Sequence, residues 1–350
     1  MSSLQEYVEK LACADEAERT FAAEDIGYLN APEGVPALLR RLGEEESRAV
    51  RDAIFQALIR IDANAAIEGS IRLLASDDPR IRNHAVNVLR RKAVRAIPFL
   101  NAVMRDGDKD LRKLVLDILR GVPAGGVEAI YEAALGDKDP NVVITAVENL
   151  GLLRAREFRG RIEELLQAGS HPMQVAACVE ALVGMGDPSS FGMIRRRFPN
   201  LAVLPDFLLA AFLKAMAVWG TAEDFNEVAA LLPFRGPHLR SAILGALFAI
   251  RARCPSAAAN TGALLAALRR IVEDGDPPLC RYQAVRILAF LAAEDDVYAF
   301  LVACLSSPER LVRLAAAESL RAAGRPGLEP LLAARANEET DEEVLQALSC

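Results

Sequence analysis

Histidine and cysteine, the side chains that most often act as bases, nucleophiles or metal ligands, are few and scattered in this sequence. The three histidines, His84, His171 and His238, are too far apart for a local metal-binding motif. We interpret each as a structural or surface residue. The six cysteines show no CxxC spacing, which is expected of reduced thiols in a cytoplasm. They are Cys13, Cys178, Cys254, Cys280, Cys304 and Cys350.

Motifs that bind phosphate or carry out hydrolysis are missing as well. The chain contains no GxGxxG, no P-loop, no GxSxG and no HExxH. Acidic residues are abundant, but no pair stands out as an acid and base couple. The sequence therefore predicts a protein that is not an enzyme, with no catalytic residue, no cofactor and no metal.

Arginine recurs at regular intervals, about once in every 31 residues over much of the chain. The members of this row are Arg19, Arg51, Arg82, Arg112, Arg240, Arg281 and Arg313. A row of cations could follow a polyanion such as nucleic acid. Each arginine also follows a turn acid by a few residues, as Arg112 follows Asp108 and Arg281 follows Asp276. Because the net charge is −7, we favour a structural ladder in which arginines pair with acids within and between repeats.

The arginine row is interrupted in the middle of the chain. Val143, Val175 and Leu209 replace arginine there, and the next position carries apolar residues such as Ile144. One interpretation is an exposed apolar patch on the central repeats. The other is that these residues pack inside the stack. The sequence leaves both open.

A second row lies five residues beyond the arginines, at the position expected on the inner helix layer. It reads Asn87, Asp117, Glu148 and Glu180 through the middle of the chain. Three acids beside an apolar floor suit a basic helix or extended peptide of a partner protein. The alternative is a helix face that is polar only because it is solvated. We predict Asn87, Asp117, Glu148, Glu180, Val143, Ile144, Val175 and Leu209 as partner-binding residues.

Both rows belong to a repeat that organises the whole sequence. Residues 77–89, DDPRIRNHAVNVL, recur as DGDKDLRKLVLDIL at 106–119 and as DPPLCRYQAVRIL at 276–288. The spacing is 30 to 34 residues, with one interval of 41. Each unit reads as a short apolar helix, a turn rich in Asp, Gly or Pro, and a second helix whose apolar stripe has the 3.6-residue period. One helical pair cannot bury its stripe alone, so the units must stack.

The second repeat, IGYLNAPEGVPALLRRLGEEESRAVRDAIFQAL at residues 26–58, resembles HEAT repeats. It is most similar to the short bacterial kind of the phycobilisome-lyase-like group. The resemblance covers almost the whole chain and implies an all-α, right-handed α–α superhelix of about ten to eleven helical hairpins. We predict a single solenoid over residues 1–350, with soft bends near 198–206 and 251–262.

Architecture constrains function only loosely here. The chain is 52% hydrophobic and only 5% aromatic, with no apolar stretch long enough to span a membrane, so we expect a cytoplasmic protein. The leading hypothesis is a non-catalytic scaffold or adaptor that binds a partner protein along the concave face, in a bacterial signalling or assembly complex. One alternative is a phycobilin-lyase-like subunit acting on a chromophore-bearing protein. Another is a HEAT-like DNA glycosylase, which the acidic balance disfavours, and we expect no binding to nucleic acid or membrane.

Overall fold

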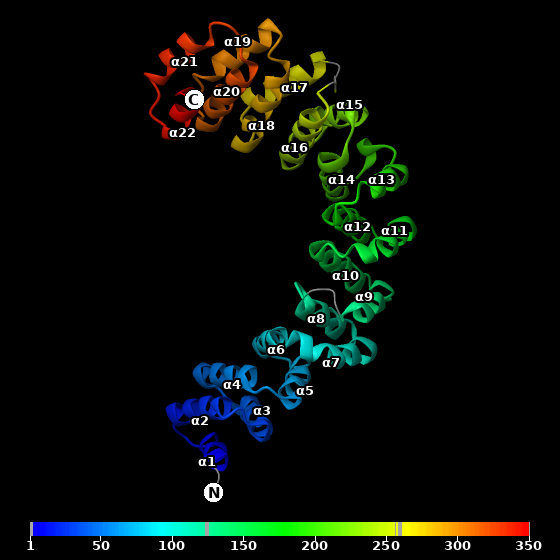
Figure 1. The fold of residues 1–350 in the computed structure, drawn as a ribbon, viewed down its shortest axis with the longest axis vertical. Coiled ribbons are helices and arrows are strands. Elements are labelled where there is room, and N and C mark those ends of the chain that lie inside the picture. Colours follow the sequence, from blue (N-terminus) through cyan, green and yellow to red (C-terminus); the bar gives the residue numbers. More distant parts are fainter. Residues whose placement is uncertain (1–2, 123–125, 256, 258–260, 350) are drawn as a thin grey trace. The chain divides into compact units, whose positions relative to one another are not determined.

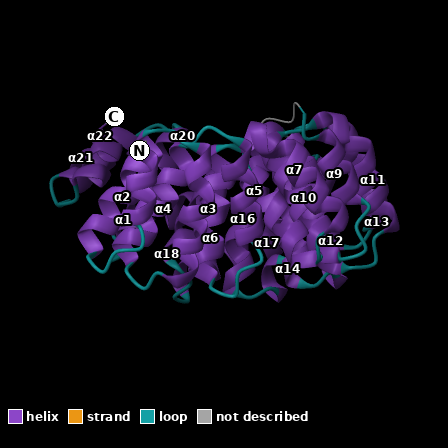
Figure 2. Ribbon diagram, turned by 90° about the horizontal axis from the view of Figure 1, so that it is seen from below, coloured by secondary structure: helices purple, strands orange, loops and turns teal. Residues whose placement is uncertain are grey.

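The computed structural model describes residues 3–122, 126–255, 257 and 261–349. Over these residues it contains twenty-two α-helices, six 3-10 helices and no strand (Figure 1, Figure 2). The predicted all-α fold is confirmed. The twenty-two helices make eleven consecutive pairs, which agrees with the ten to eleven hairpins expected from the repeat.

Contacts within the chain separate two compact units, Met1–Ile162 and Glu163–Cys350. The first contains α1 (Ser3–Lys10), α2 (Glu16–Tyr28), η1 (Pro32–Gly34), α3 (Val35–Glu44), α4 (Arg48–Arg60), α5 (Asn64–Leu73), α6 (Pro79–Arg91), α7 (Ala93–Asp106), α8 (Lys109–Leu119), α9 (Glu128–Leu135), α10 (Pro140–Leu153) and η2 (Arg156–Phe158). The boundary falls inside α11 (Arg159–Ala168).

The second unit continues the same alternation of helices. It contains α12 (Pro172–Met185), η3 (Pro188–Ser190), α13 (Phe191–Arg197), η4 (Leu201–Val203), α14 (Asp206–Trp219), α15 (Ala222–Ala230), η5 (Leu232–Phe234), α16 (Pro237–Arg253), α17 (Thr261–Glu273), α18 (Pro278–Leu288), η6 (Ala289–Leu291), α19 (Asp295–Cys304), α20 (Arg310–Ala323), α21 (Leu328–Ala336) and α22 (Glu342–Ser349).

The helices of each unit form two layers. In the first unit the even-numbered helices α2 to α10 pack each against the next, and the odd-numbered helices α3 to α9 do the same (Figure 1). In the second unit α12, α14, α16, α18, α20 and α22 pack in the same succession. We call the even-numbered helices of either unit its second-helix layer. This is the layer that carries the predicted arginine and acidic rows.

The turn residues of the repeat begin these helices by capping them. Asp108 accepts hydrogen bonds from the backbone N–H groups of Asp110 and Leu111, both at 2.9 Å, at the start of α8. Asp78 and Asp139 cap α6 and α10 in the same way, each one residue before a proline. A capping carboxylate satisfies a free N–H group, and proline is suited to the first helical position. The turn chemistry of the repeat therefore sets where each second helix starts.

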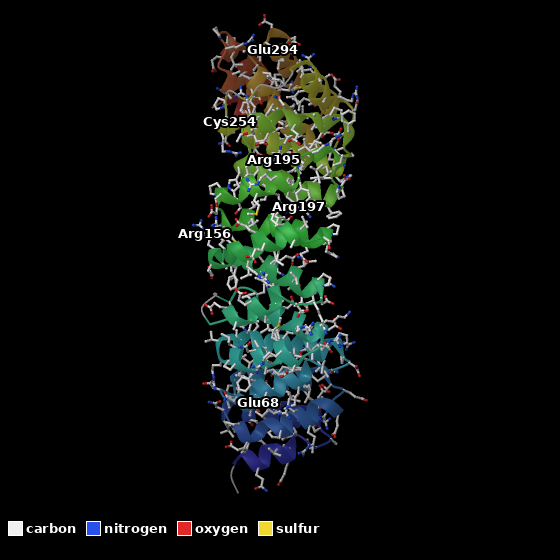
Figure 3. All side chains as sticks on the ribbon, turned by 90° about the vertical axis from the view of Figure 1, so that its right-hand side faces the viewer. Glu68, Arg156, Arg195, Arg197, Cys254 and Glu294 are labelled. Atoms are coloured by element: carbon white, nitrogen blue, oxygen red, sulfur yellow. The ribbon has the colours of Figure 1, made fainter. Side chains whose placement is uncertain are left out.

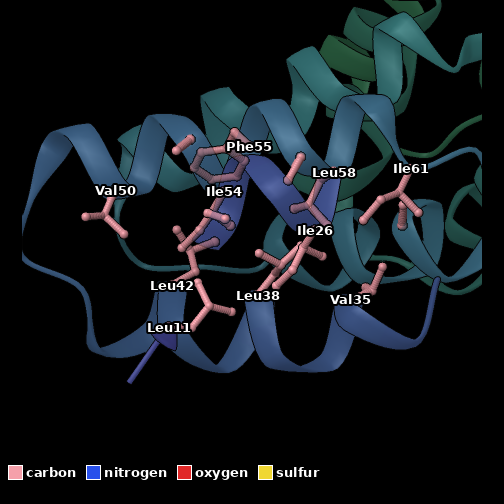
Figure 4. Close-up of a cluster of buried hydrophobic side chains, with 14 of the residues drawn as sticks. Leu11, Ile26, Val35, Leu38, Leu42, Val50, Ile54, Phe55, Leu58 and Ile61 are labelled. Carbon is pink, nitrogen blue, oxygen red and sulfur yellow. The ribbon is translucent and has the colours of Figure 1, made fainter. Parts of the chain in front are cut away.

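The apolar stripe predicted for the second helices is buried. Ala85, Val88 and Leu89 of α6 are fully buried, whereas Ile81 at the start of the stripe is only partly covered. At the N-terminal end of the first unit, side chains from α2, α3 and α4 fill one continuous cluster (Figure 4). The labelled members include Ile26, Leu38, Ile54 and Leu58. Stacking thus buries what a single hairpin would leave exposed.

The sequence predicts soft bends near residues 198–206 and 251–262 of a single solenoid. Residues 198–206 contain η4, which lies between α13 and α14. The expected bend at 251–262 includes residues 256 and 258–260, which lie outside the described residues. Among the helices that are described, none is long and apolar enough to cross a membrane.

Candidate functional site

The arginines of the predicted ladder bind the turn that precedes the next second helix. Arg112 of α8 donates from Nε to Asp137 Oδ2 at 2.5 Å and from Nη2 to Asp137 Oδ1 at 2.8 Å. The remaining guanidinium nitrogen of Arg112, Nη1, donates to the carbonyl oxygen of Gly107 at 2.8 Å. Asp137 also accepts the backbone N–H of Asp139, the residue that caps α10. One arginine therefore joins its own turn to the next turn.

The same arrangement occurs near both ends of the chain. Arg19 donates to both carboxylate oxygens of Glu45, at 2.9 and 3.1 Å, and Arg313 does so with Glu339, at 2.7 and 2.9 Å. Burial by itself raises the pKa of Glu45, but the hydrogen bonds from Arg19, Arg41 and a backbone N–H lower it to about 2. The hydrogen bond from Arg313 lowers the pKa of Glu339 to about 2 against the effect of burial.

The pairing partners differ from those expected within one turn. Arg112 does not pair with Asp108, because that carboxylate caps α8. Arg281 pairs with Glu309, 3.3 Å away in the following turn, while Asp276 binds Arg240 of the preceding repeat.

Arg82 and Arg51 of the ladder bind carbonyl oxygens of their own turns and have no close acid partner among the described residues. Arg82 donates to the carbonyl oxygens of Ser76 and Asp77 rather than to a carboxylate. Arg51 donates to the carbonyl oxygen of Glu46, and its nearest carboxylate, Asp78, is 3.9 Å away. Where a ladder arginine has a close acid partner, as Arg112 does, that acid comes from the next turn.

The interruption of the ladder results from packing and not from an exposed patch. Val143, Val175 and Leu209 are 4%, 3% and 0% exposed, and Ile144 is half-buried. The alternative of an exposed apolar patch is therefore corrected for these positions. The acid partner of Arg112, Asp137, lies two residues before the residue that caps the next second helix. The central repeats that lack the arginine are each followed by a turn that lacks an acid at this position. Val203 stands at this position in the turn after Val175.

Another set of ion pairs supports this part of the second unit. Arg235 donates to Asp206 at 2.7 Å and to the carbonyl oxygen of Ala202 at 2.6 Å. On α13, Arg195 is 2.6 Å from Glu227 Oε2, and Arg197 donates to the carbonyl oxygen of Gly169 (Figure 3). The basic side chains here hold turns in place.

The acidic row divides between the two units. Asn87, Asp117 and Glu148 lie on α6, α8 and α10 of the first unit, where Asn87 and Glu148 are exposed and Asp117 is half-exposed. None of the three side chains makes an ion pair or hydrogen bond with another described residue. Glu180 lies on α12 of the second unit, and its Oε1 is 2.6 Å from Lys214 Nζ. Glu180 is thus paired, whereas Asp117 and Glu148 make no ion pair with a described residue.

Asp117 lines a surface cavity of about 520 Å³ in the first unit. Four carboxylates line this cavity, from Asp77, Asp108, Asp110 and Asp117, against two cations, Arg82 and Lys113. The guanidinium of Arg82 is already bound to carbonyl oxygens of its turn. We call this site the acidic cavity. The row at Asn87, Asp117 and Glu148 indicated this face, but the contribution of the turn acids requires the fold.

The second unit contains a smaller pocket that the sequence did not predict. Gly245, Phe248, Tyr282 and Arg286 line about 220 Å³ between α16 and α18. The guanidinium of Arg286 lies 5.3 Å from the centre of the Phe248 ring and donates to the Tyr282 hydroxyl at 2.9 Å. It also binds Glu318 of α20. The signal in the sequence is Gly245, the one glycine in a row that is otherwise polar or charged.

The thiols and metal-ligating side chains form no further centre in the described part of the chain. Burial raises the pKa of Cys178 to about 12 and that of Cys304 to about 11, so both remain protonated thiols at neutral pH. Over the same residues, no three His, Cys, Asp or Glu side chains are placed to hold a metal ion.

Pairs of helices stacked in two layers, with arginine and acid pairs between successive turns, define an α–α repeat protein. A family model described as HEAT repeats matches residues 4–90 in the first unit and residues 263–349 in the second. The chain is a HEAT-repeat protein.

One curated relative belongs to bilin metabolism. The chain is 39% identical over 62 residues to "Bilin biosynthesis protein PecE" of Mastigocladus laminosus, which covers 18% of this chain and 23% of that protein. The chain therefore spans less than a quarter of that relative in the match. The similarity supports a relation to the phycobilisome-lyase-like HEAT group.

Solved structures with the same fold include the karyopherin Kap121p. A Kap121p mutant superimposes with a TM-score of 0.52 at 13% identity, over 99% of this chain and 44% of that chain. Kap121p bound to the extreme C-terminus of the protein phosphatase Cdc14p gives 0.51 at 12% identity, over 99% and 45%. This chain spans less than half the length of either karyopherin, and the likeness is one of fold.

Proposed function

We propose that this protein is a non-catalytic scaffold or adaptor that binds a basic segment of a partner protein on the second-helix layer of its first unit. The observation that carries the proposal is the acidic cavity, where four carboxylates face two cations. Elsewhere in the chain, carboxylates such as Glu45 and Glu180 are matched by arginine or lysine. Unmatched acids in a surface cavity attract cationic groups and select against acidic partners.

The extent of the surface suits a polypeptide. Asp117 and Glu148 lie on adjacent helices of one layer, and Asn87 extends the row by one helix in the other direction. A peptide that crosses these helices can place basic side chains at successive acids. Solved structures of the same fold contain bound proteins: Kap121p has been seen with Ste12p, Pho4p and Nup53p. This supports partner binding as a use of such a fold. The cellular role we propose is assembly or signalling in a bacterium.

Charge reversal tests the proposal directly. Partners crosslinked to the protein in its own cells are identified by mass spectrometry for the wild type and for Asp117→Lys combined with Glu148→Lys. We expect the double variant to lose the partner. Glu68→Lys is the matched control, because Glu68 is an exposed acid on α5, one of the odd-numbered helices outside the second-helix layer (Figure 3). An unchanged set of partners in the double variant contradicts the acidic cavity as the binding surface.

The match to PecE favours one second candidate, a subunit that handles a bilin on a chromophore-bearing protein. A bilin needs a cavity of its own, and the pocket between α16 and α18 offers an aromatic ring and an arginine. Mixing the purified protein with a bilin should then shift the absorbance spectrum, and Arg286→Gln should reduce the shift. No spectral change on mixing contradicts this candidate.

A further inference from the structure

A surface pocket of about 340 Å³ lies between the N-terminal halves of α4 and α6 in the first unit. Its polar wall carries three guanidinium groups, one imidazole, one amide and a single carboxylate. These belong to Arg48, Arg51, Arg80, His84, Asn83 and Asp52. The chain as a whole has a net charge of −7. The pocket therefore concentrates positive charge in a protein that is acidic overall.

The cations of this pocket are poorly matched by nearby acids. Arg48 Nε is 3.6 Å from Asp52 Oδ2, and Arg51 Nη1 is 3.9 Å from Asp78 Oδ2. Arg80 makes no ion pair with any described residue. Charge-assisted hydrogen bonds between arginine and carboxylate are normally about 2.7 to 2.9 Å long. The pocket arginines keep donor groups that no protein acceptor uses at such a distance.

The helix dipole does not favour the arginines of this pocket, because two of them lie at the N-terminal ends of helices. Arg48 is the first residue of α4 and Arg80 the second residue of α6. The N-terminal end of a helix carries partial positive charge, so it favours anions and disfavours cations. The arginine that begins α20 is neutralised by acids: Arg310 lies 2.8 Å from Asp341 and also binds Glu343. Arg80 has no such partner, and Arg48 has only Asp52, at 3.6 Å.

Two stacked aromatic rings form one wall of the pocket. The His84 ring lies parallel to the ring of Phe55, with centroids 4.4 Å apart and an angle of 6° between the planes. Phe55 is buried, so the imidazole covers it and faces the pocket. His84 Nε2 is 3.5 Å from Asp52 Oδ1. The stack fixes the orientation of the imidazole ring in the pocket wall.

We propose that this pocket binds a dianionic oxyanion, a phosphate or phosphomonoester, through Arg48, Arg51 and Arg80. Guanidinium groups suit tetrahedral oxyanions because they donate two parallel hydrogen bonds. The bound anion accepts hydrogen bonds from the free donors of the three arginines. This pocket is separate from the acidic cavity, so the inference does not depend on the proposed binding of a basic segment.

Titration calorimetry on the full chain tests the inference with two probes, inorganic phosphate and a short phosphoserine peptide whose other residues are uncharged. We expect saturable binding that Arg80→Gln weakens about tenfold or more, because a hydrogen bond to a charged group is lost. Arg48→Gln provides a second variant with the same expectation, and both residues are exposed enough to be replaced without loss of the fold. Arg91→Gln is the matched control, since Arg91 is exposed at the opposite end of α6.

The two probes distinguish the source of the anion. Equal affinity for both supports a pocket for free phosphate, whereas tighter binding of the peptide supports a phosphorylated partner. The unphosphorylated peptide should not bind. No saturable binding of either probe overturns the inference. So does an equal weakening by Arg91→Gln, because the attraction is then a general effect of charge.

Discussion

The guanidinium of Arg112 and the carboxylate of Asp137 form a two-bonded ion pair that joins α8 to the turn before α10. The pair is largely buried, with 11% and 7% of the two side chains exposed. The acid also accepts a backbone N–H of its own turn, which keeps it in register for the arginine. Where this contact occurs between successive turns, it couples one hairpin to the next.

Removal of the ion pair between Arg112 and Asp137 should destabilise the first unit. We expect Asp137→Asn to lower the free energy of unfolding by about 2 kcal/mol, because Arg112 is left partly buried without its counter-charge. Urea denaturation measures the loss, and hydrogen exchange should show faster exchange in α8 and α10. Arg51→Gln is the control, since its nearest carboxylate is 3.9 Å away. An equal effect of both substitutions would show that the close pair has no special role.

Acid should weaken the protein through the low pKa values of Glu45 and Glu339. Glu339 has a pKa of about 2 in the folded chain against an ordinary value of 4.5. The folded pKa is the lower one, so its contribution to stability is complete above pH 4.5 and is lost as the pH falls towards 2. We expect a loss of about 2 kcal/mol from this group over that interval. Denaturation at a series of pH values measures it, and Glu339→Gln should flatten the profile.

Truncation at the interrupted ladder should show that the central apolar residues belong to the core. Leu209 is 0% exposed, and Leu209→Ala should lower stability by about 2 to 5 kcal/mol through loss of packing. Leu279→Ala is the control, because Leu279 is 54% exposed and its truncation should change stability by no more than about 0.5 kcal/mol. Thermal denaturation followed by circular dichroism compares them. A loss of stability for Leu209→Ala as small as that for Leu279→Ala would contradict burial of Leu209 and support an exposed apolar patch.

Two glycines should respond to alanine in opposite directions. A Cβ on Gly245 would have only Gln283 Nε2 within 4 Å, at 3.9 Å, so Gly245→Ala should stabilise α16 by about 0.5 to 1 kcal/mol. A Cβ on Gly27 would lie 2.7 Å from Ala57 Cα, so Gly27→Ala should separate α2 from α4 and destabilise the protein. Melting temperatures of the two variants test this contrast. A melting temperature lowered by Gly245→Ala would show that this glycine has a structural role.

The sequence by itself determined the helices and the layer on which the arginine row and the acidic row lie. The apolar stripe at Ala85, Val88 and Leu89, the capping acids and the period of the repeat are local properties, and each sets a helix or its start. The arginine row could be recognised in the sequence because it has the same period. A pattern that recurs through the chain can be recognised even where single repeats depart from it.

Only the tertiary structure decided the partners of those residues. Arg112 reaches Asp137 and not Asp108, because the nearer acid is already a helix cap, and Val175 is buried because its helix packs in the stack. The pocket between α4 and α6 also required the fold. Residues such as Arg48 and Arg80 lie 32 positions apart, and only the packing of the two helices brings their side chains to one cavity.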